Sequence, residues 1–397
     1  MTKVLIRILY GVLARMLNIF IPVQKKHWIF GADFGNSYRE GSKYLLEYMV
    51  KNHPDFTCTF VTDKKDVKKE LDSKGIPCVM NNSIIGIIEI AKADVVITAQ
   101  FLNDIRFVFK KKNRSYYYLL HGQPYKKAIN AMSDKASAIL SEKSTFKKQL
   151  FCHLMKWFVY NYDLSDVSFM SATSDFMKPW MELTIGNDVP MKILGSPRND
   201  GLFNHSKMKS EKWVEGIDGK IIVTYMPTHR LYGKGELSPI PFEHNKDIQE
   251  WLRTHNVVLL VKQHPNMIPK LNNPINTDVI KDITKMTLDP QVVIYNTDVL
   301  ITDYSSVFID FLLFKRPILF YIYDNYEDVE GCLYDIHGDF PNSFCYNENE
   351  LFERIKDSIL DKDHVAPTIE VVNKFHKYID DKSCERYYQE IIKEKYN

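Results

Sequence analysis

The segment Val299–Tyr321 predicts a β-strand, a short helix and a second β-strand in immediate succession. It opens with an apolar run of strand length, continues through the helical pattern of Val307–Lys315, and enters a second apolar run at Pro317. Ser305 and Ser306 stand at the start of the helix, where serine hydroxyls bond backbone N–H groups or a ligand. A strand that leads into a helix N-terminus also suits a phosphate group. For this segment alone, an ordinary capped helix explains the pattern equally well.

The same alternation of short β-rich runs and helical segments continues along the chain and predicts an α/β fold class. A chain of 397 residues can form two domains of ordinary size. We therefore expect two Rossmann-like, doubly wound domains that face a cleft. The predicted strands are His27–Gly31, Thr57–Thr62, Pro77–Met80, Asp94–Ala99, Tyr116–Leu120, Ser168–Ala172, Met191–Leu194, Ile221–Tyr225, Val257–Val261, Val292–Tyr295, Leu300–Thr302 and Ile318–Tyr321. The predicted helices include Glu40–Lys51, Lys64–Lys74, Ile84–Lys92, Ile248–Thr254, Leu351–Leu360 and Val371–Lys393.

The predicted domain boundaries follow changes in composition along the chain. Residues 1–25 form an N-terminal amphipathic helix, residues 26–203 the first Rossmann-like domain, and residues 204–365 the second. Residues 366–397 form a C-terminal helix that packs back on the first domain. The polar segment Asn204–Lys220 is the predicted hinge.

Overall charge and cysteine usage exclude several classes of function. The net charge is +2, so the molecule as a whole is not a binder of polyanions such as nucleic acid. The six cysteines are scattered without a Cys-x-x-Cys pair, which indicates neither a zinc site nor a disulfide framework. The chain contains no P-loop and no Gly-x-Gly-x-x-Gly fingerprint, which disfavours NTPases and dinucleotide enzymes. His121 and His264 fall in different predicted domains, so no shared metal site is expected.

Two segments mix cations with apolar or aromatic residues. Lys3–Val23 contains Arg7 and Arg15 within an apolar pattern that is too short for a confident membrane span. An amphipathic helix on an anionic membrane surface fits this pattern, and a helix packed on the domain fits it equally well. Lys143–Tyr162, which mixes lysines with phenylalanines and a tryptophan, is the second candidate for membrane contact.

Polar side chains follow three predicted strands of the second domain. Ligands of open parallel sheets bind beyond the carboxyl ends of the strands, so these side chains are expected at one edge. Arginine, lysine and serine supply the charges and donors that phosphates require. Each residue alone is more simply a surface charge or a capped turn, and only their convergence indicates a pyrophosphate or nucleotide site. The candidates are Thr228 and Arg230 after the first of these strands, Lys262 and His264 after the second, and Asp303, Ser305 and Ser306 after the third.

The first domain offers a candidate base and two turns. His121 follows the predicted strand Tyr116–Leu120, and an imidazole with an ordinary pKa of about 6.5 suits a general base at neutral pH. A core histidine that donates to a carbonyl is the simpler alternative. The predicted cleft-lining residues are Gly122, Gln123 and Pro124 after the histidine, and Arg198, Asn199 and Asp200 in a second turn that otherwise caps the following helix.

Five motifs occur in the order found in the CDP-glycerol glycerophosphotransferases of teichoic acid synthesis, and the chain resembles that family over Trp28 to Asp324. The motifs are His121-Gly-x-Pro, Gly195-x-Pro-Arg-Asn-Asp200, Pro227-Thr-x-Arg230, His264-Pro265 and Asp303-Tyr-Ser-Ser306. The resemblance implies a GT-B-like fold, with the nucleotide held mainly by the second domain and the acceptor approaching from the first.

The resemblance also implies a reaction. His121 would take the proton of an acceptor hydroxyl as that hydroxyl attacks the β-phosphorus of a CDP-linked polyol phosphate. His264, Arg230, Ser305 and Ser306 would hold the pyrophosphate and stabilise the departing CMP. The implied acceptor is a saccharide on a polyprenyl diphosphate, met at the cytoplasmic face of the bacterial membrane by a peripheral enzyme without an obligatory metal ion or cofactor.

The chain departs from the family pattern at three positions. Gln123 replaces a usual threonine, Ser196 a common aromatic residue and His229 a common tryptophan, which leaves the polyol and the acceptor open. Glycerol and ribitol both fit, as do single addition and polymerisation. The alternatives are a GT-B glycosyltransferase that uses a nucleotide-sugar and a non-catalytic module that binds membrane or glycan.

Overall fold

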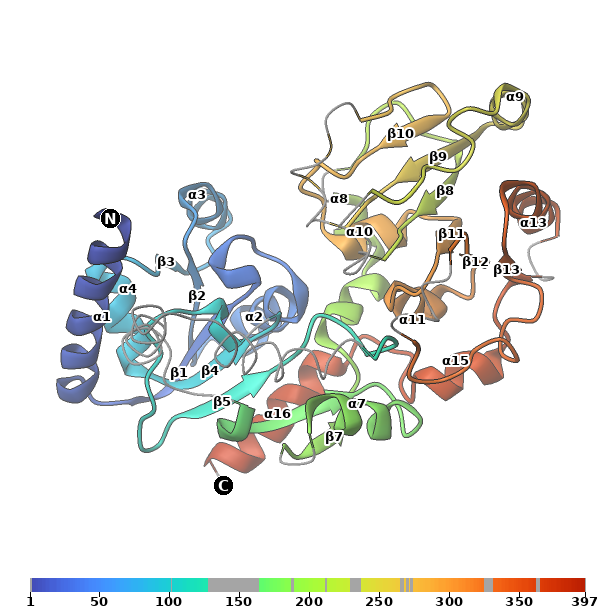
Figure 1. The fold of residues 1–397 in the computed structure, drawn as a ribbon. Coiled ribbons are helices and arrows are strands. Elements are labelled where there is room, and N and C mark those ends of the chain that lie inside the picture. The colour runs from blue at the N-terminus through green and yellow to red at the C-terminus, as the bar shows by residue number, and fades with distance from the viewer. Residues whose placement is uncertain are drawn as a thin grey trace, which may run out of the picture. The chain divides into compact units, whose positions relative to one another are not determined.

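The computed structural model describes residues 2–100, 102–127, 164–186, 189–210, 213–228, 237–264, 268, 271, 274–324, 331–361 and 365–396 (Figure 1). It divides into two compact units. The first unit contains Met1–His121, Ile129–Phe203 and Asp380–Asn397, and the second contains Gly122–Ala128 and Asn204–Ile379. Each unit is built around one parallel sheet.

The sheet of the first unit has seven strands in the order β3-β2-β1-β4-β5-β6-β7. All of its strand pairs are parallel, and the order reverses direction between β1 and β4, as in doubly wound folds. The strands are β1 Gln24–Gly31, β2 Thr57–Thr62, β3 Cys78–Met80, β4 Ala93–Thr98, β5 Ser115–Tyr118, β6 Val167–Ala172 and β7 Met191–Ile193. The helices described in this unit are α1 Thr2–Phe20, α2 Glu40–Asn52, α3 Lys65–Ser73, α4 Ile84–Lys92, α7 Met177–Ile185 and α16 Ser383–Tyr396, with 3₁₀ turns at Asp33–Gly35, Leu102–Asp104, Leu164–Asp166 and Pro197–Phe203.

Neighbouring residues of β1 pack their side chains on opposite faces of this sheet, and both faces are covered by helices. Ile29 packs on one face with Ile90 of α4. Trp28 points to the other face, where its ring lies 5.3 Å from that of Phe56 and 6.4 Å from that of Tyr388 in α16. Because neighbouring residues of a strand face opposite sides, this buried pattern is typical of a sheet between two helical layers.

The sheet of the second unit has six parallel strands in the order β10-β9-β8-β11-β12-β13. The strands are β8 Ile221–Tyr225, β9 Val257–Val261, β10 Ile280–Asp282, β11 Val299–Thr302, β12 Ile318–Tyr321 and β13 Phe344–Cys345. The described helices are α8 His205–Ser210, α9 Lys246–Thr254, α10 Pro290–Tyr295, α11 Val307–Phe311, α13 Glu348–Leu360 and α15 Ile369–Phe375, with a 3₁₀ turn at Leu312–Phe314.

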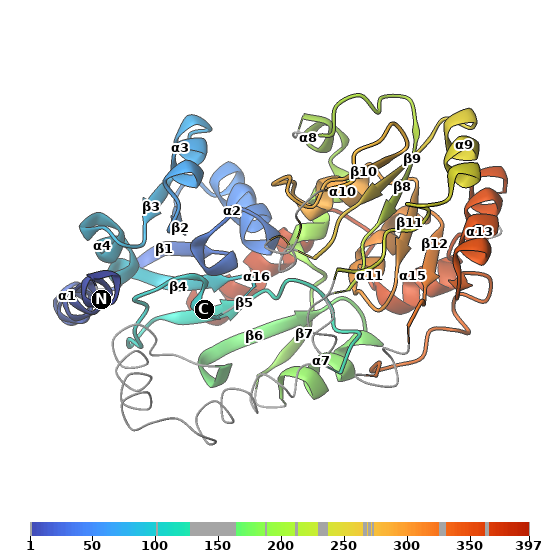
Figure 2. The same cartoon turned by 45° about the horizontal axis from the view of Figure 1, so that its top comes forward.

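Strand β9 shows how the second sheet is packed on both sides. Val257 and Leu259 contribute to a core with residues of α9 and α13. Val258 and Leu260 point the other way, into a core that includes Val293 of α10. Figure 2 shows the sheet between α10 on one side and α9 and α13 on the other.

Two predicted elements are wrong. Val292–Tyr295, predicted as a strand, belongs to the helix α10, because Asp289 caps it by accepting the Gln291 N–H at 3.0 Å and Pro290 occupies its first turn. Val371–Lys393, predicted as one helix, is broken between α15 and α16. The break contains the boundary between the two units, which falls after Ile379. The short edge strands β10 and β13 were not predicted.

The units also differ from the predicted domains in places. Gly122–Ala128, predicted in the first domain, belongs to the second unit. Residues 366–379, predicted as part of the C-terminal helix, also belong to the second unit. The predicted hinge is part of the second core, because Val214 and Ile217 are buried there. None of the described helices is both long and apolar enough to cross a bilayer. Lys143–Tyr162 lies outside the described residues.

Candidate functional site

Three loops of the second unit meet at one edge of its sheet. The strands β9, β8 and β11 are neighbours, and all three run in the same direction. The loops after their carboxyl ends therefore lie side by side. They carry Lys262 and His264 after β9, Thr228 after β8, and Asp303, Ser305 and Ser306 after β11.

Asp303 holds the loop after β8 in place. Its side chain is buried, and Oδ1 accepts the backbone N–H of Thr228 at 2.8 Å. Thr302, the last residue of β11, donates its hydroxyl to the carbonyl of Met226 at 2.8 Å. These bonds connect segments about 75 residues apart, so Asp303 positions the neighbouring loop from a buried site rather than presenting its carboxylate to a ligand.

The two serines and His264 are the accessible members of this group. Ser306 occupies the position before α11 but its side chain does not cap the helix. Neither serine hydroxyl has a hydrogen-bond partner among the described residues, and both side chains are partly exposed. His264 is exposed, whereas Lys262 is largely buried. Arg230 and Pro265, which the sequence adds to this site, lie outside the described residues.

His121 stands at the carboxyl end of β5 in the first unit, where its backbone is fixed by Arg198. The guanidinium Nη1 of Arg198 donates to the His121 carbonyl and forms an ion pair of 3.0 Å with Glu40, the first residue of α2. Both members of that pair are buried. Leu120, the residue before the histidine, has a φ of 59°, in the left-handed region. Arg198 is thus a positioning residue for His121.

The surroundings of His121 favour a neutral imidazole. Burial lowers the pKa of His121 to about 4, and the cations of Arg198 and Arg39 act in the same direction, against a hydrogen bond with the backbone of Gln100. The His121 side chain still reaches solvent, so burial alone does not account for the lowered pKa. The positive charges of Arg198 and Arg39 also disfavour the protonated imidazole and lower its pKa in the same direction. A neutral, accessible imidazole can accept a proton at physiological pH.

Asp200 caps the helix α16. Helix capping is the alternative that the sequence left open, but the sequence pointed to the helix that directly follows Asp200 in the chain. Its carboxylate accepts the N–H of Ser383 at 3.0 Å and that of Cys384 at 2.7 Å, at the start of α16. Gly195 is close to the same helix: its φ is +83°, and an added Cβ would lie 2.5 Å from the Ser383 hydroxyl. The turn that contains Asn199 and Asp200 therefore fastens α16 to the first unit, and the prediction that Asp200 faces an acceptor is not supported by its contacts.

Asp200→Asn is expected to remove a pH dependence of stability. Burial raises the pKa of Asp200 to about 6, so the folded protein binds this proton more tightly than the unfolded chain. The contribution of Asp200 to stability is therefore present below the unfolded pKa and is lost as the pH rises through the folded one. Urea unfolding of the parent protein should show about 1 kcal/mol of extra stability from this group near pH 5.5 relative to pH 7.5. An identical pH dependence in the asparagine variant would contradict this assignment.

The residues after His121 are buried in the second unit. Gln123 and Pro124 are buried, and the Pro124 carbonyl accepts the Tyr334 hydroxyl at 3.0 Å. The next residue, Tyr125, packs its ring 5.3 Å from that of Phe308 in α11. The burial of Gln123 and Pro124 thus gives no support to their predicted role in lining a cleft, whereas Gly122 is partly exposed.

Sequence reasoning missed the buried partner of Arg198. Glu40 resembles any acidic residue in the first turn of a helix, and its pairing partner is 158 residues away. No cluster of three or more His, Cys, Asp or Glu side chains suitable for a metal ion occurs in the part of the chain that the structure describes.

Known proteins resemble this chain along nearly its whole length. The teichoic acid glycerol-phosphate transferase of Staphylococcus aureus is 26% identical over 396 residues, covering 95% of both chains. The teichoic acid poly(glycerol phosphate) polymerase of Bacillus subtilis is 26% identical over 361 residues, which are 86% of this chain but 45% of that protein. The structure of the wall teichoic acid polymerase TagF superposes with a TM-score of 0.72 at 20% identity, covering 98% of this chain and 93% of that one, which confirms the predicted fold. A model of the CDP-glycerol:poly(glycerophosphate) glycerophosphotransferases matches residues 13–393, so the chain belongs to this family.

Proposed function

We propose that this protein transfers a polyol phosphate from a CDP-linked donor to a hydroxyl of a lipid-linked saccharide or growing polymer and releases CMP. Glycerol phosphate is the proposed group, since the family model and the two relatives described above all carry glycerol phosphate in their names. The observation that carries the proposal is the family match over residues 13–393, which spans both units. The proposed location is peripheral, at the cytoplasmic face of an anionic membrane.

The proposed chemistry uses the residues at the ends of the strands. The acceptor oxygen forms a bond to the β-phosphorus, the bond between that phosphorus and the bridging oxygen breaks, and CMP leaves with the electron pair. His121 accepts the proton of the attacking hydroxyl, as its neutral imidazole allows. Stabilising the charge of the pyrophosphate is the main task in phosphoryl transfer. The proposed cationic groups are Lys262, His264 and Arg230, and the proposed neutral donors are the hydroxyls of Ser305 and Ser306.

His264→Ala should lower kcat/KM by about a hundredfold with little change in stability. A hydrogen bond to a charged phosphate contributes roughly 1.5–3 kcal/mol, and the His264 side chain is exposed. Steady-state rates of CMP release and thermal unfolding measure the two effects. His244→Ala, which removes another exposed histidine of the same unit, is the matched control. Equal rates for His264→Ala and the control would remove His264 from the site.

A donor panel tests the reaction class. The purified protein is incubated with a lipid-linked disaccharide and, in separate reactions, CDP-glycerol, CDP-ribitol or UDP-sugars, and the released nucleotide is identified. The expected result is acceptor-dependent CMP from one CDP-polyol, unchanged by a chelator of divalent cations. Release of UMP or UDP would instead indicate a sugar transferase, and binding of donor without release would indicate a non-catalytic module.

A further inference from the structure

Helix α1 is apolar on two opposite faces. On the inner face, Ala14 is buried against Ile87 and Phe107, with Leu17 packed beside them. The outer face carries a stripe of exposed apolar side chains at helical spacing. They are Leu9, Val12, Met16, Ile19 and Phe20, of which the last two are each 77% exposed. We name these five residues the α1 stripe.

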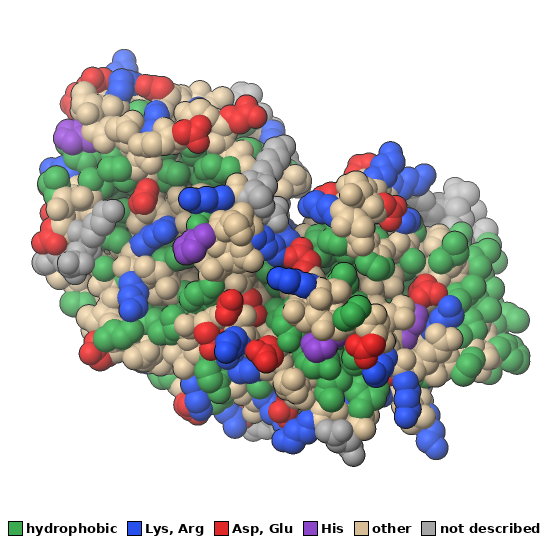
Figure 3. Space-filling view, turned by 180° about the vertical axis from the view of Figure 1, so that it is seen from behind, with side chains coloured by type: hydrophobic (Ala, Val, Ile, Leu, Met, Phe, Trp, Pro, Cys, Tyr) green, Lys and Arg blue, Asp and Glu red, His purple; other side chains and the backbone are tan. Residues whose placement is uncertain are grey.

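A helix that covers a protein in water normally turns polar side chains outward. The α1 stripe reverses this rule, so its outer face is suited to an apolar surrounding. Helix α4, which packs against α1, adds the exposed Ile84 and Ile85. Figure 3 shows the hydrophobic side chains gathered along the edge that carries α1, at the right of that view. Only Arg15 is charged among the described side chains of α1, so the predicted basic, amphipathic helix is not confirmed as such.

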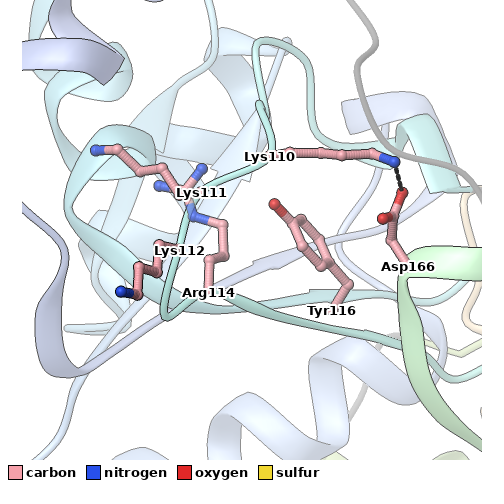
Figure 4. Close-up of a pocket in the computed structure, with 6 residues that line it drawn as sticks. All are labelled: Lys110, Lys111, Lys112, Arg114, Tyr116 and Asp166. Carbon is pink, nitrogen blue, oxygen red and sulfur yellow. Dashed lines mark ion pairs between the residues drawn. The ribbon is translucent and has the colours of Figure 1, made fainter.

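A pocket rich in cations adjoins the C-terminal end of α1. It has a volume of about 380 Å³ and is lined by Lys110, Lys111, Lys112, Arg114, Tyr116 and Asp166 (Figure 4). Lys111 donates to the carbonyl of Ile21, directly after α1, and to that of Ala91. Arg114 donates to the carbonyls of Ile90 and Ala91 at the end of α4, at 2.7 and 2.9 Å. These bonds tie the pocket to the same two helices that carry the exposed apolar residues.

The charges of the pocket are unbalanced. Its lining includes four cationic side chains and one carboxylate, Asp166, which pairs with Lys110 at 2.7 Å. Figure 4 shows that ion pair on one side of the Tyr116 ring and Lys111, Lys112 and Arg114 on the other. Lys112 is exposed and has no ion-pair partner among the described residues. In the sequence, residues 1–32 contain five Lys or Arg and no Asp or Glu, and one of these cations, Lys26, pairs with Asp55 at 2.6 Å.

We propose that the α1 stripe and the cation-rich pocket of Lys110, Lys111, Lys112 and Arg114 together form a docking surface for an anionic lipid bilayer. The apolar stripe enters the boundary between headgroups and acyl chains, and the lysines lie at the level of the phosphate groups. The occupant is a bilayer rather than a protein partner because the apolar stripe ends at a cationic pocket, an order that matches the layers of a membrane surface. This inference rests on the membrane location proposed above and assigns the surface that makes the contact. Binding is measured without donor or acceptor, so a failure of vesicle binding would leave the proposed reaction intact.

The apolar arm of the test replaces the exposed end of the stripe. Met16→Asp, Ile19→Asp and Phe20→Asp are combined in one variant, and flotation is measured with vesicles of phosphatidylcholine and phosphatidylglycerol. The expected result is at least about a tenfold loss of partitioning, because apolar burial is replaced by charge. The matched control combines Leu183→Asp with Leu360→Asp, which change side chains 60% and 78% exposed on other helices and should bind like the parent protein.

The basic arm replaces Lys110 and Lys112 by glutamine. Each cation near an anionic bilayer should contribute about fivefold in partitioning at low salt, and less as salt is raised. The control replaces Lys65 and Lys69, which are exposed on α3. Equal effects of the two lysine pairs would show unspecific attraction and overturn the role of the pocket.

Three further results would overturn the proposal. The first is equal vesicle binding by the parent protein and the stripe variant, provided that both unfold at the same temperature. The second is release of the bound protein by millimolar inorganic phosphate at constant ionic strength, which would make the pocket a site for a soluble anion. The third is a self-association of the parent protein that the stripe variant loses while vesicle binding is retained, which would make the stripe an interface between two copies.

Discussion

His121→Ala is expected to lower turnover by two to four orders of magnitude while the protein remains folded. The imidazole is accessible at the end of β5, and its lowered pKa keeps it in the proton-accepting form at neutral pH. The loss should appear in kcat and in kcat/KM alike, because proton transfer accompanies the attack on phosphorus. His244→Ala removes another exposed histidine and serves as the control.

The pH profile gives the same prediction an independent readout. The working form of His121 is neutral, so its activity is lost only as the pH falls toward its lowered pKa. The acid limb of kcat/KM should therefore lie below the range of an ordinary histidine, whose pKa is about 6.5. An acid limb near pH 6.5, or a normal rate for His121→Ala, would contradict the assignment of His121 as the base.

Arg198→Met is expected to cost about 3–5 kcal/mol of unfolding free energy, because it leaves the carboxylate of Glu40 buried without its cation. It also removes the donor to the His121 carbonyl, so turnover should fall beyond what the loss of folded protein explains. Urea unfolding and the rate per folded molecule separate the two effects. The partly exposed pair Arg354–Asp357 provides the control, since Arg354→Met should cost less than about 1 kcal/mol.

A double variant tests whether Arg198 positions His121 or only balances a charge. Adding Glu40→Gln to Arg198→Met removes the stranded carboxylate and should restore much of the stability. Turnover per folded molecule should stay low, because the His121 backbone still lacks its donor. Recovery of both quantities together would show that Arg198 acts only through Glu40.

The sheets could be predicted from the sequence because their strands are buried on both faces. Runs such as Val257–Val261 are continuously apolar and bounded by polar residues, a pattern typical of a central parallel strand. The neighbouring positions of β9, β8 and β11 then bring their loops together. The helix at Pro290–Tyr295 was mistaken for a strand because its apolar core is short, and the capping role of Asp289 was overlooked.

The roles of the polar motif residues were harder to predict, since their partners are distant in the chain. Asp303 bonds a backbone N–H 75 residues away, and Asp200 bonds two that lie more than 180 residues away. A carboxylate that fastens remote backbone has the same local sequence context as one that meets a ligand. Only the folded structure distinguishes these scaffolding residues from His121, His264 and the two serines, whose side chains remain accessible.

The measurement that tests the proposed reaction most directly is the fate of the β-phosphorus. CDP-glycerol labelled in both the glycerol and the β-phosphorus is incubated with the protein and a lipid-linked saccharide, and the extracted lipid is counted against released nucleotide. Transfer of glycerol phosphate predicts one glycerol and one phosphorus in the lipid for each CMP released. Glycerol in the lipid without phosphorus, accompanied by CDP, or CMP release that does not depend on the acceptor, would contradict the proposed reaction.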